Sequence, residues 1–520
     1  MNDVIRAWRW RGEVRSLVRR PPSLEGARAR VREAVATRER RFLASMQQHV
    51  WSVPSSPYLP LLRHAGVESG DLATLVRAEG LEGALGALRD AGVYVSHEEW
   101  LGKQAVRRGS LELRMRPATF VNPRLPSTFF GHSGGTRTGG VPVQWSFAAL
   151  RRGVDPYLLR ASSWGVAGTP AAIWLPAQPS AVGIATALML AAAGEPPERW
   201  FTPVGTARRK PWRVAATNLL LPAVLRSAGV RLPRPRYAPL SEPGAVLDWC
   251  RDALARAGRA RLGAYTSSAV RLAELARARG VALEGMVIAT LGEPLGPERA
   301  AAIRASGASP ANGYGFMQKG TVAHACPHCE DDDLHLLESE VAVIPRERSR
   351  PDGRKVSAFL WTSLDHETPS VLINVENDDY GRIDVDAEAC DCELGAAGVR
   401  RRVSAIRGMT KVTAEGMTVP AEVLERLVEK VLPQAFGGTP ADYQFVQLGT
   451  GRDAGLVLRI APRLGAIDDA AVAAAVEGEL RTTLAGLLAA EVWSQARTLR
   501  PLRIEPEATA SGKVLPLSIA

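Results

Sequence analysis

From about residue 118 onward, short β-branched or aliphatic runs alternate with longer stretches that have helical spacing. The runs 171–175, 286–290 and 334–344 predict strands, and the stretches 243–257 and 267–278 predict helices. Alternation of this kind favours an α/β architecture in which β-sheets are flanked by helices. A chain of 520 residues is also long enough for two or more domains.

Three regions are predicted from changes in this pattern. Residues 1–110 have helical spacing interrupted by prolines, and residues 111–408 form the main α/β domain. Residues 409–520 follow the order helix, strand, strand, helix, which is typical of a small α+β lid domain. Its last helix is predicted over 469–490, with Asp468 or Asp469 as the cap.

The composition indicates an ordinary globular protein, with 46% hydrophobic and 23% charged residues. The net charge of +11 comes from arginines spread along helical stretches such as 251–261 and 297–304. They form either solvated helix faces or a surface that attracts nucleotides, CoA or an acidic carrier protein. No basic strip is interleaved with aromatic residues, which argues against nucleic acid as a partner.

The longest apolar run, around 181–193, is too short to span a bilayer and predicts a buried helix. No secretory signal is recognised near the N-terminus, so we expect a cytoplasmic protein without a membrane partner. The pattern leaves open whether residues 1–50 belong to the main domain, form a homodimer contact or dock a carrier protein.

A glycine-rich stretch lies near the start of the predicted main domain. It comprises Ser133, Gly134, Gly135, Thr136, Arg137, Thr138, Gly139 and Gly140. Glycines let successive backbone N–H groups converge on phosphate oxygens, and hydroxyl and guanidinium groups add donors. A plain surface loop has the same composition, and no Gly-Lys-Ser/Thr follows as in a Walker A loop.

Four of the five cysteines form two close pairs about sixty residues apart. Cys326 and Cys329 make one pair, and Cys390 and Cys392 make the other. Four thiolates in this arrangement suit a tetrahedral structural zinc, with an insert over about 324–392. His324 and His328 are alternative ligands, and buried cysteines without metal are the remaining interpretation.

The C-terminal stretch 509–514 places Lys513 after Ser511 and Gly512. A lysine on a mobile terminal segment can deliver a compact positive charge to a carboxylate and a phosphate at once. A lysine simply exposed at the C-terminus is the other interpretation.

Taken in order, these features resemble the adenylate-forming superfamily of acyl-CoA synthetases, peptide synthetase adenylation domains and luciferases. The stretch 133–139 resembles its phosphate loop, and 509–514 resembles its final motif, whose lysine is catalytic. Gly292-Glu293-Pro294 resembles the turn beside the adenine. The segment 312–318, with Asn312, Gly313, Tyr314 and Gly315, resembles the Tyr-Gly-x-Thr/Ser-Glu motif, whose tyrosine stacks on adenine.

The resemblance extends to the ribose site and the hinge. Asp379, or Asp378 as a second choice, matches the aspartate that binds the ribose hydroxyls. Arg407, followed by Glu415-Gly416, matches the hinge arginine that contacts ribose or phosphate. The cysteine pairs resemble the phenylacetate–CoA ligase branch in particular. The resemblance extends over roughly residues 40–520, and it is weak before residue 118.

Three departures from the family pattern bear on the chemistry. Gln318 replaces the usual glutamate, so Gln318 and Thr138 are uncertain magnesium ligands. Val143 stands where many relatives have lysine, and Ile406 replaces the glycine before the hinge arginine.

The resemblance implies an AMP-forming ligase that uses ATP and Mg²⁺ to convert a carboxylic acid into an acyl-adenylate, then transfers the acyl group to CoA. An apolar acid pocket is expected around Tyr265, Ser267, Gly292 and Gly313, which favours an aromatic or other hydrophobic acid. An amine, a carrier protein or another acceptor could replace CoA. A degenerate nucleotide-binding protein without catalysis is the alternative of another class.

Overall fold

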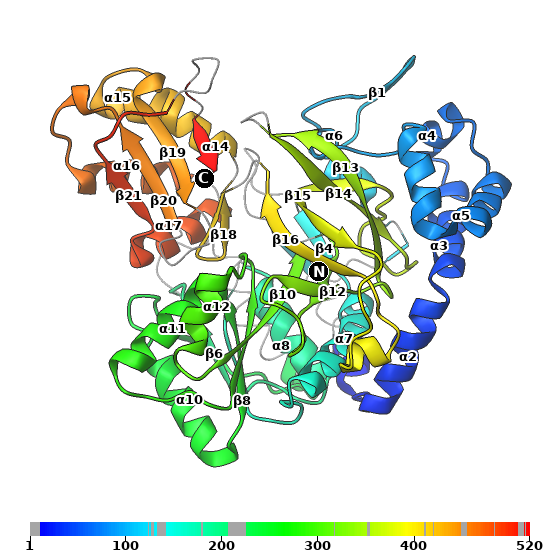
Figure 1. Ribbon diagram of the computed structural model, residues 1–520, viewed down its shortest axis with the longest axis horizontal. Helices are drawn as coiled ribbons and strands as arrows, with labels where there is room; N and C mark the ends of the chain where they lie inside the picture. Colours follow the sequence, from blue (N-terminus) through cyan, green and yellow to red (C-terminus); the bar gives the residue numbers. More distant parts are fainter. Residues whose placement is uncertain are drawn as a thin grey trace.

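The computed structural model describes residues 11–122, 124–125, 129–132, 142–177, 180–205, 225–316, 318–350, 354–409, 412–419, 421–448, 455–482, 484–507, 514 and 516–519. Figure 1 shows helices at the N-terminal side, a large sheet in the middle and a small C-terminal unit beside it. The expected α/β architecture, with sheets flanked by helices, is confirmed.

The N-terminal region is mainly helical. It contains α2 (Leu24–Ala36), α3 (Arg38–Met46), α4 (Tyr58–His64), α5 (Ser69–Asp90) and α6 (His97–Trp100), followed by the short strands β1 (Val106–Arg108) and β2 (Leu111–Leu113). Buried residues such as Phe42 and Leu85 share one hydrophobic cluster with Leu360 and Val375 of the large sheet. The helical region is therefore packed onto the sheet.

The central sheet has twelve strands in the order β13-β14-β15-β16-β12-β11-β10-β9-β8-β5-β6-β7. Its parallel half consists of β5 (Ala171–Trp174), β6 (Arg199–Thr202), β7 (Pro235–Tyr237), β8 (Ala260–Tyr265), β9 (Met286–Leu291) and β10 (Ser309–Phe316). Its antiparallel half consists of β11 (Gly320–His324), β12 (Asp333–Leu336), β13 (Val341–Ser349), β14 (Lys355–Ser363), β15 (Val375–Asp384) and β16 (Arg402–Gly408). Strand β10 joins the halves, since it is parallel to β9 and antiparallel to β11.

Helices cover the parallel half on both sides (Figure 1). They are α7 (Phe147–Ser163), α8 (Val182–Ala192), α10 (Gly244–Ala257), α11 (Thr266–Ala278) and α12 (Pro297–Arg304). Because helices cover the parallel half of the sheet on both faces, its strands β8 and β9 are almost wholly buried. The short α13 (Glu393–Ala396) follows the second cysteine pair. A further hairpin, β3 (Phe129–His132) with β4 (Pro142–Trp145), flanks the glycine-rich stretch.

The C-terminal unit contains more elements than the sequence predicts. After the hairpin β17 (Val412–Ala414) and β18 (Met417–Val419) come α14 (Ala421–Arg426), α15 (Leu432–Phe436), α16 (Asp469–Leu480) and α17 (Leu484–Ala496). A four-stranded sheet has the order β21 (Leu499–Leu502), β20 (Gly455–Ile460), β19 (Tyr443–Leu448), β22 (Leu517–Ile519). Asp468 caps α16 as expected, because its side chain accepts a hydrogen bond from Ala470 N. The single helix predicted over 469–490 is wrong, since α16 ends at Leu480 and α17 begins at Leu484.

Within the part of the chain that the structure describes, no helix combines the length and apolar character needed to cross a membrane.

Candidate functional site

Three polar side chains meet where β10 and β15 lie close together. The Tyr314 hydroxyl donates to Asp379 Oδ2 at 2.7 Å, and Asn377 Nδ2 donates to both Tyr314 Oη (2.8 Å) and Asp379 Oδ2 (2.9 Å). Burial and the Asp379 carboxylate raise the pKa of Tyr314 well above its usual value, so the hydroxyl remains a donor. The structure thus joins two residues predicted for adenine and ribose, and adds Asn377.

Backbone irregularity in β15 sets the position of Asp379. Asp378 has a left-handed φ of 68°, and its carbonyl accepts a hydrogen bond from Met409 N at 2.9 Å. Both aspartates are buried, and it is the carboxylate of Asp379 that reaches Tyr314. Asp379 is therefore the better candidate of the two aspartates.

The Gly292 turn lies at the carboxyl end of β9, against the start of α11. Glu293 Oε2 accepts from Ser267 N at 2.9 Å, and the Glu293 carbonyl accepts from Thr266 Oγ1 at 3.1 Å. Gly292 has a φ of 81°, and a Cβ there would come within 2.8 Å of the Tyr265 ring. Glycine is therefore required for this close approach, and Glu293 satisfies a backbone donor at the helix start.

Strand register brings the Gly292 turn beside the Tyr314 cluster. Asn312 of β10 pairs with Thr290 of β9, so Tyr314 and Gly292 each lie two residues further along neighbouring parallel strands. The carboxyl ends of parallel strands are where open α/β sheets bind ligands. At Gly315 a Cβ would meet Gly320 O at 2.5 Å, which explains glycine at that position of the motif.

The expected pocket residues occupy this edge. Tyr265 and Ser267 are buried, Gly313 is half-buried, and Pro294 follows Glu293 in the turn. The Ser267 hydroxyl is buried and has no hydrogen-bond partner among the residues that the structure describes.

The C-terminal unit reaches this site through its first hairpin. The two-residue turn Glu415-Gly416 has φ values of 52° and 70°, as a type I′ turn requires. A Cβ on Gly416 would lie 2.2 Å from the Tyr265 ring, so the Gly416 backbone packs directly against that ring. Glu415 also forms an ion pair with Arg271 of α11 at 2.7 Å.

Helix α17 makes a second set of contacts with the main domain. Glu491 Oε1 accepts from Gly205 N at 2.6 Å, and Gln495 Oε1 accepts from Leu240 N at 3.2 Å. Arg271 Nη2 donates to the Ala496 carbonyl at 3.2 Å. The C-terminal unit is thus docked by both its hairpin and α17.

Gln318 and Arg407 each lie near a residue of the Tyr314 cluster. Gln318 lines a small pocket with Asn377, His97 and Trp100, so the N-terminal helix α6 contributes to this side of the site. Arg407 lies on β16 opposite Tyr380, the residue after Asp379. Its Nη2 donates to Asp332 at 3.1 Å, and its Nη1 donates to the carbonyl of Ile406 at 2.8 Å.

Two of the predicted motifs lie outside the described residues. They are the glycine-rich stretch, with Ser133, Gly134, Gly135, Thr136, Arg137, Thr138, Gly139 and Gly140, and the tail residue Lys513. The strand that follows Lys513 in the sequence, β22, pairs with β19 of the C-terminal sheet.

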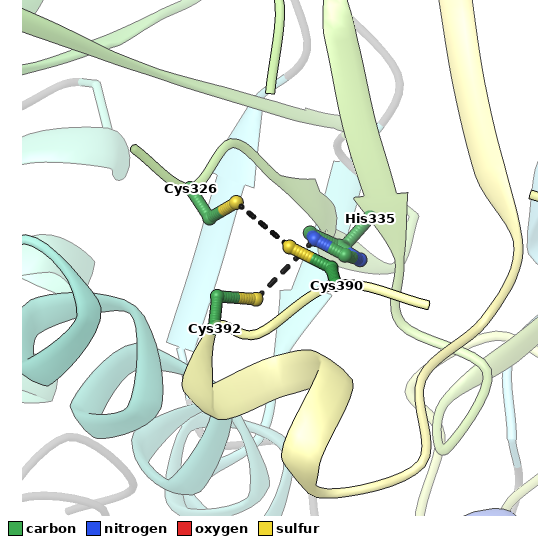
Figure 2. A group of neighbouring side chains, drawn as sticks. All are labelled: Cys326, His335, Cys390 and Cys392. Atoms are coloured by element: carbon green, nitrogen blue, oxygen red, sulfur yellow. Dashed lines mark hydrogen bonds between the residues drawn. The ribbon is translucent and has the colours of Figure 1, made fainter. Parts of the chain in front are cut away.

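A second cluster of functional groups forms between β11, β12 and α13 (Figure 2). The donor atoms of Cys326, His335, Cys390 and Cys392 all lie within 4.8 Å of one another. Cys326 Sγ is 3.5 Å from Cys390 Sγ, and Cys392 Sγ is 3.4 Å from His335 Nε2. Cys329, expected as the fourth ligand, lies 3.3 Å from Cys326 but outside this set.

The donor set fits a tetrahedral metal ion. A zinc ion with bonds of about 2.3 Å would separate its sulfur ligands by about 3.8 Å, close to the observed spacing. Cys392 is the N-cap residue of α13. Gly395 packs closely against Cys390, since a Cβ added to Gly395 would lie 1.9 Å from Cys390 O. Sequence reasoning missed His335, although a histidine six residues after Cys329 was a usable signal.

The two histidines considered as substitute ligands lie elsewhere. His324 is buried, and its Nδ1 lies 3.3 Å from Arg160 Nη1. Burial and the charge of Arg160 lower the pKa of His324 well below its usual value. His328 is exposed.

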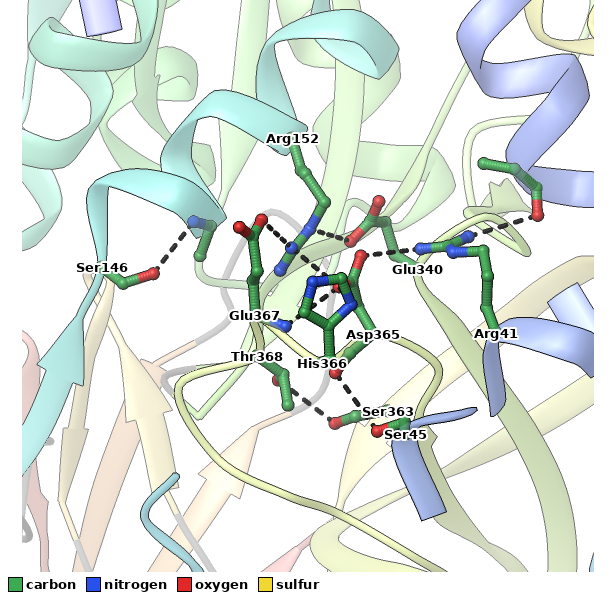
Figure 3. A network of polar contacts seen from close by, with 12 residues as sticks. Arg41, Ser45, Ser146, Arg152, Glu340, Ser363, Asp365, His366, Glu367 and Thr368 are labelled. Carbon is green, nitrogen blue, oxygen red and sulfur yellow. Dashed lines mark hydrogen bonds and ion pairs between the residues drawn. The ribbon is translucent and has the colours of Figure 1, made fainter. Parts of the chain in front are cut away.

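A network of ion pairs connects Asp365 and Glu340 through Arg152 (Figure 3). Asp365 pairs with Arg41 of α3 at 2.7 Å and with Arg152 of α7 at 3.0 Å. Glu340 pairs with Lys319, the residue after Gln318, at 3.1 Å. Burial tends to raise the pKa of Asp365, but Arg152, a backbone N–H and Arg41 lower it to about 2.

The sequence matches no protein-family model and no curated protein. Among solved structures, the chain shares its fold with 2-hydroxyisobutyryl-CoA ligase. The structure of 2-hydroxyisobutyryl-CoA ligase in complex with 2-HIB-AMP and CoA, in the thioesterification state, aligns with a TM-score of 0.52 and 15% identity. The alignment covers 94% of this chain and 90% of that one.

Other matches are weaker. The postadenylation state of the same enzyme gives a TM-score of 0.43 at 14% identity, covering 93% of this chain and 89% of that one. An adenylation domain of a keto acid-selecting NRPS module gives a TM-score of 0.30 at 10% identity, and the alignment covers 74% of this chain and 67% of that one. Likeness at these identities establishes a fold, so the reaction has to be argued from this chain's own residues.

Proposed function

We propose that this protein activates a carboxylic acid with ATP, forming an acyl-adenylate and pyrophosphate, and then transfers the acyl group to CoA as a thioester. The observation that carries the proposal is the Tyr314–Asn377–Asp379 cluster, which lies beside the Gly292 turn at the carboxyl ends of β9 and β10. Such an edge binds ligands in open α/β sheets.

In this proposal the nucleoside lies over the Tyr314 cluster. The Tyr314 ring and the Gly292-Glu293-Pro294 turn enclose the adenine, and Asp379 accepts hydrogen bonds from the ribose hydroxyls. Asn377 and Tyr314 both donate to Asp379 Oδ2, so the carboxylate is fixed before the ligand arrives. Residues 133–139 hold the β- and γ-phosphates, and Arg407 contacts ribose or phosphate.

Both reacting groups are anionic, so the chain must supply positive charge where they meet. We assign that role to Lys513, which would lie between the carboxylate and the α-phosphate. Magnesium, when bound to ATP, neutralises phosphate charge. Gln318 offers it a neutral amide oxygen, whereas the nearby Glu376 carboxylate is already paired with Arg346 and Arg348. The phosphates and Thr138 would therefore supply most of the metal's other ligands.

The acid is proposed to bind near Tyr265, Ser267, Gly292 and Gly313. The Tyr265 ring supplies an apolar wall, which suits an aromatic or other hydrophobic acid. The unpartnered Ser267 hydroxyl offers one hydrogen bond to a polar substituent. Alternative acceptors in the second half-reaction are an amine or a carrier protein in place of the CoA thiol.

The cysteine cluster is proposed as a structural zinc site with Cys326, His335, Cys390 and Cys392 as ligands. A closed four-ligand site leaves no position for a substrate, so it would hold two loops together and activate no water. Cys329, in contact with Cys326, is the alternative to His335 that the sequence favours.

A degenerate nucleotide-binding protein remains the second candidate, and one observation favours it. Gln318 brings no negative charge to the metal, and Glu376, which lines the same pocket, is paired with Arg346 and Arg348. Such a protein would bind ATP without exchanging pyrophosphate.

The deciding experiment is ATP–pyrophosphate exchange with a panel of aromatic and aliphatic acids. Lys513→Ala should abolish exchange while ATP still binds, because the charge acts on the reacting groups. Lys430→Ala is the matched control, since Lys430 is an exposed lysine of the same C-terminal unit. Exchange that depends on one acid supports the ligase. ATP binding without exchange for any acid would establish the degenerate protein instead.

A further inference from the structure

Three consecutive aspartates lie between Cys329 and His335, the latter a residue of the metal cluster. Each one pairs with a different arginine of the main domain. The pairs are Asp331 with Arg304 of α12, Asp332 with Arg407 of β16, and Asp333 with Arg402 of β16. Of these three arginines, Arg407 alone belongs to the proposed nucleotide site.

The position of Arg407 depends on an irregularity in β16. Between the pairs Tyr380–Arg407 and Arg382–Ser404, β15 advances two residues and β16 advances three. The extra residue coincides with Ala405, which has a left-handed φ of 53°. Such a bulge redirects the side chains that follow it.

Asp332 fixes one side of the Arg407 guanidinium and leaves the rest available. Arg407 Nη2 donates to Asp332 Oδ2 at 3.1 Å, and Nη1 donates to Ile406 O at 2.8 Å. A guanidinium carries five N–H donors in a rigid plane. The two contacts therefore orient the plane, and further N–H groups remain for an anionic or hydroxyl ligand.

The metal cluster in turn fixes Asp332. Cys329, on one side of the loop, contacts Cys326, and His335, on the other side, contacts Cys392. Strand β12 begins at Asp333 and pairs with β16, the strand that carries Arg407. The carboxylate is thus held by elements that depend on the cluster, while its exposed fraction is 26%.

We propose that Asp332 is a positioning residue for the hinge arginine, through which the metal loop sets the geometry of the nucleotide site. This inference rests on the proposed function, because it assigns Arg407 a ligand. It gives the cysteine–histidine cluster a role in the reaction without contact between metal and substrate.

The test is a double-mutant cycle on AMP affinity, measured by calorimetry, and on exchange rate. Asp332→Asn should weaken AMP binding and slow exchange by roughly tenfold each, as a misplaced contact does. In the Arg407→Ala background, Asp332→Asn should have no further effect, since its action passes through that side chain. Asp331→Asn, which breaks the neighbouring pair with Arg304, should leave both quantities unchanged, and zinc content should be equal in all variants.

Additive losses in the double variant would overturn the proposal, because they are what a general loosening of the loop produces. An equal effect of Asp331→Asn, or a wild-type protein that does not bind AMP, would overturn it as well. A wild-type protein that binds AMP but exchanges pyrophosphate with no acid refutes the proposed ligase activity, and the cycle on AMP affinity still decides the role of Asp332.

Discussion

Replacing Gly416 by alanine should undock the C-terminal unit from the main domain. Gly416 has a φ of +70°, and its added Cβ would lie 2.2 Å from two atoms and 2.5 Å from a third atom of the Tyr265 ring. A left-handed φ costs an L-residue about 1–2 kcal/mol, and overpacking of a close contact costs about 1–3 kcal/mol. Because the hairpin keeps this φ whether or not the unit is docked, only the overpacking cost of about 1–3 kcal/mol lowers the docked population, by about 5-fold or more relative to the undocked one.

Hydrogen–deuterium exchange read by mass spectrometry measures this directly. Peptides from 484–496 and 235–242 should exchange faster in Gly416→Ala, because the bond from Leu240 N to Gln495 opens with undocking. The interior strands β19 and β20 should keep their protection, since they pair within the C-terminal unit.

Gly465→Ala provides the matched control. Gly465 lies in the same unit with a φ of +75°, and nothing lies within 4 Å of its added Cβ. At its ψ of −159° this φ is adopted almost only by glycine, so the variant carries at least as much backbone strain, without the contact with Tyr265. Equal exchange in the two variants, or unchanged protection of 484–496 in Gly416→Ala, would refute the reasoning that this contact holds the unit in place.

Three further predictions concern the ion network, the metal cluster and the nucleotide site. Asp365, with its pKa lowered from 3.8 to about 2, contributes about 2 kcal/mol of stability that is present above pH 3.8 and is lost as the pH falls through about 2. Asp365→Asn should remove that part of the pH dependence, measured by chemical denaturation across this range, and an unchanged slope would contradict it. His335→Ala should lower the zinc content measured by mass spectrometry, whereas Cys329→Ser should retain it, and the opposite result would favour the four-cysteine site. Tyr314→Phe removes one of two hydrogen bonds to Asp379 and should weaken AMP binding roughly tenfold, as loss of a bond to a charged group does, without changing thermal stability much.

Local signals in the sequence were sufficient for several elements. The strand predicted at 286–290 is β9, and the cap at Asp468 forms because a side-chain oxygen reaches a backbone N–H two residues away. The glycine motifs also marked positions of close approach, such as Gly292 against Tyr265. These features depend on neighbours in the chain, so the order of residues reveals them.

Other features depend on packing between distant segments. The run 334–344, predicted as one strand, is split into β12 and β13 because each pairs with a different partner, β16 and β14 respectively. The helix predicted over 469–490 is likewise two helices, α16 and α17, and both bury residues in the main hydrophobic cluster. Apolar periodicity alone cannot say which surface a segment will cover.

The sequence by itself determined the α/β class, the cysteine pairs and the candidate residues of the nucleotide site, since each is a pattern of residue types at short spacing. Only the tertiary structure brought His335 to the thiols, Asn377 to Tyr314 and Asp332 to Arg407. The last contact joins residues 75 positions apart in the chain. Such contacts arise from strand order and register in the central sheet, which are fixed by long-range burial and pairing that no short segment encodes.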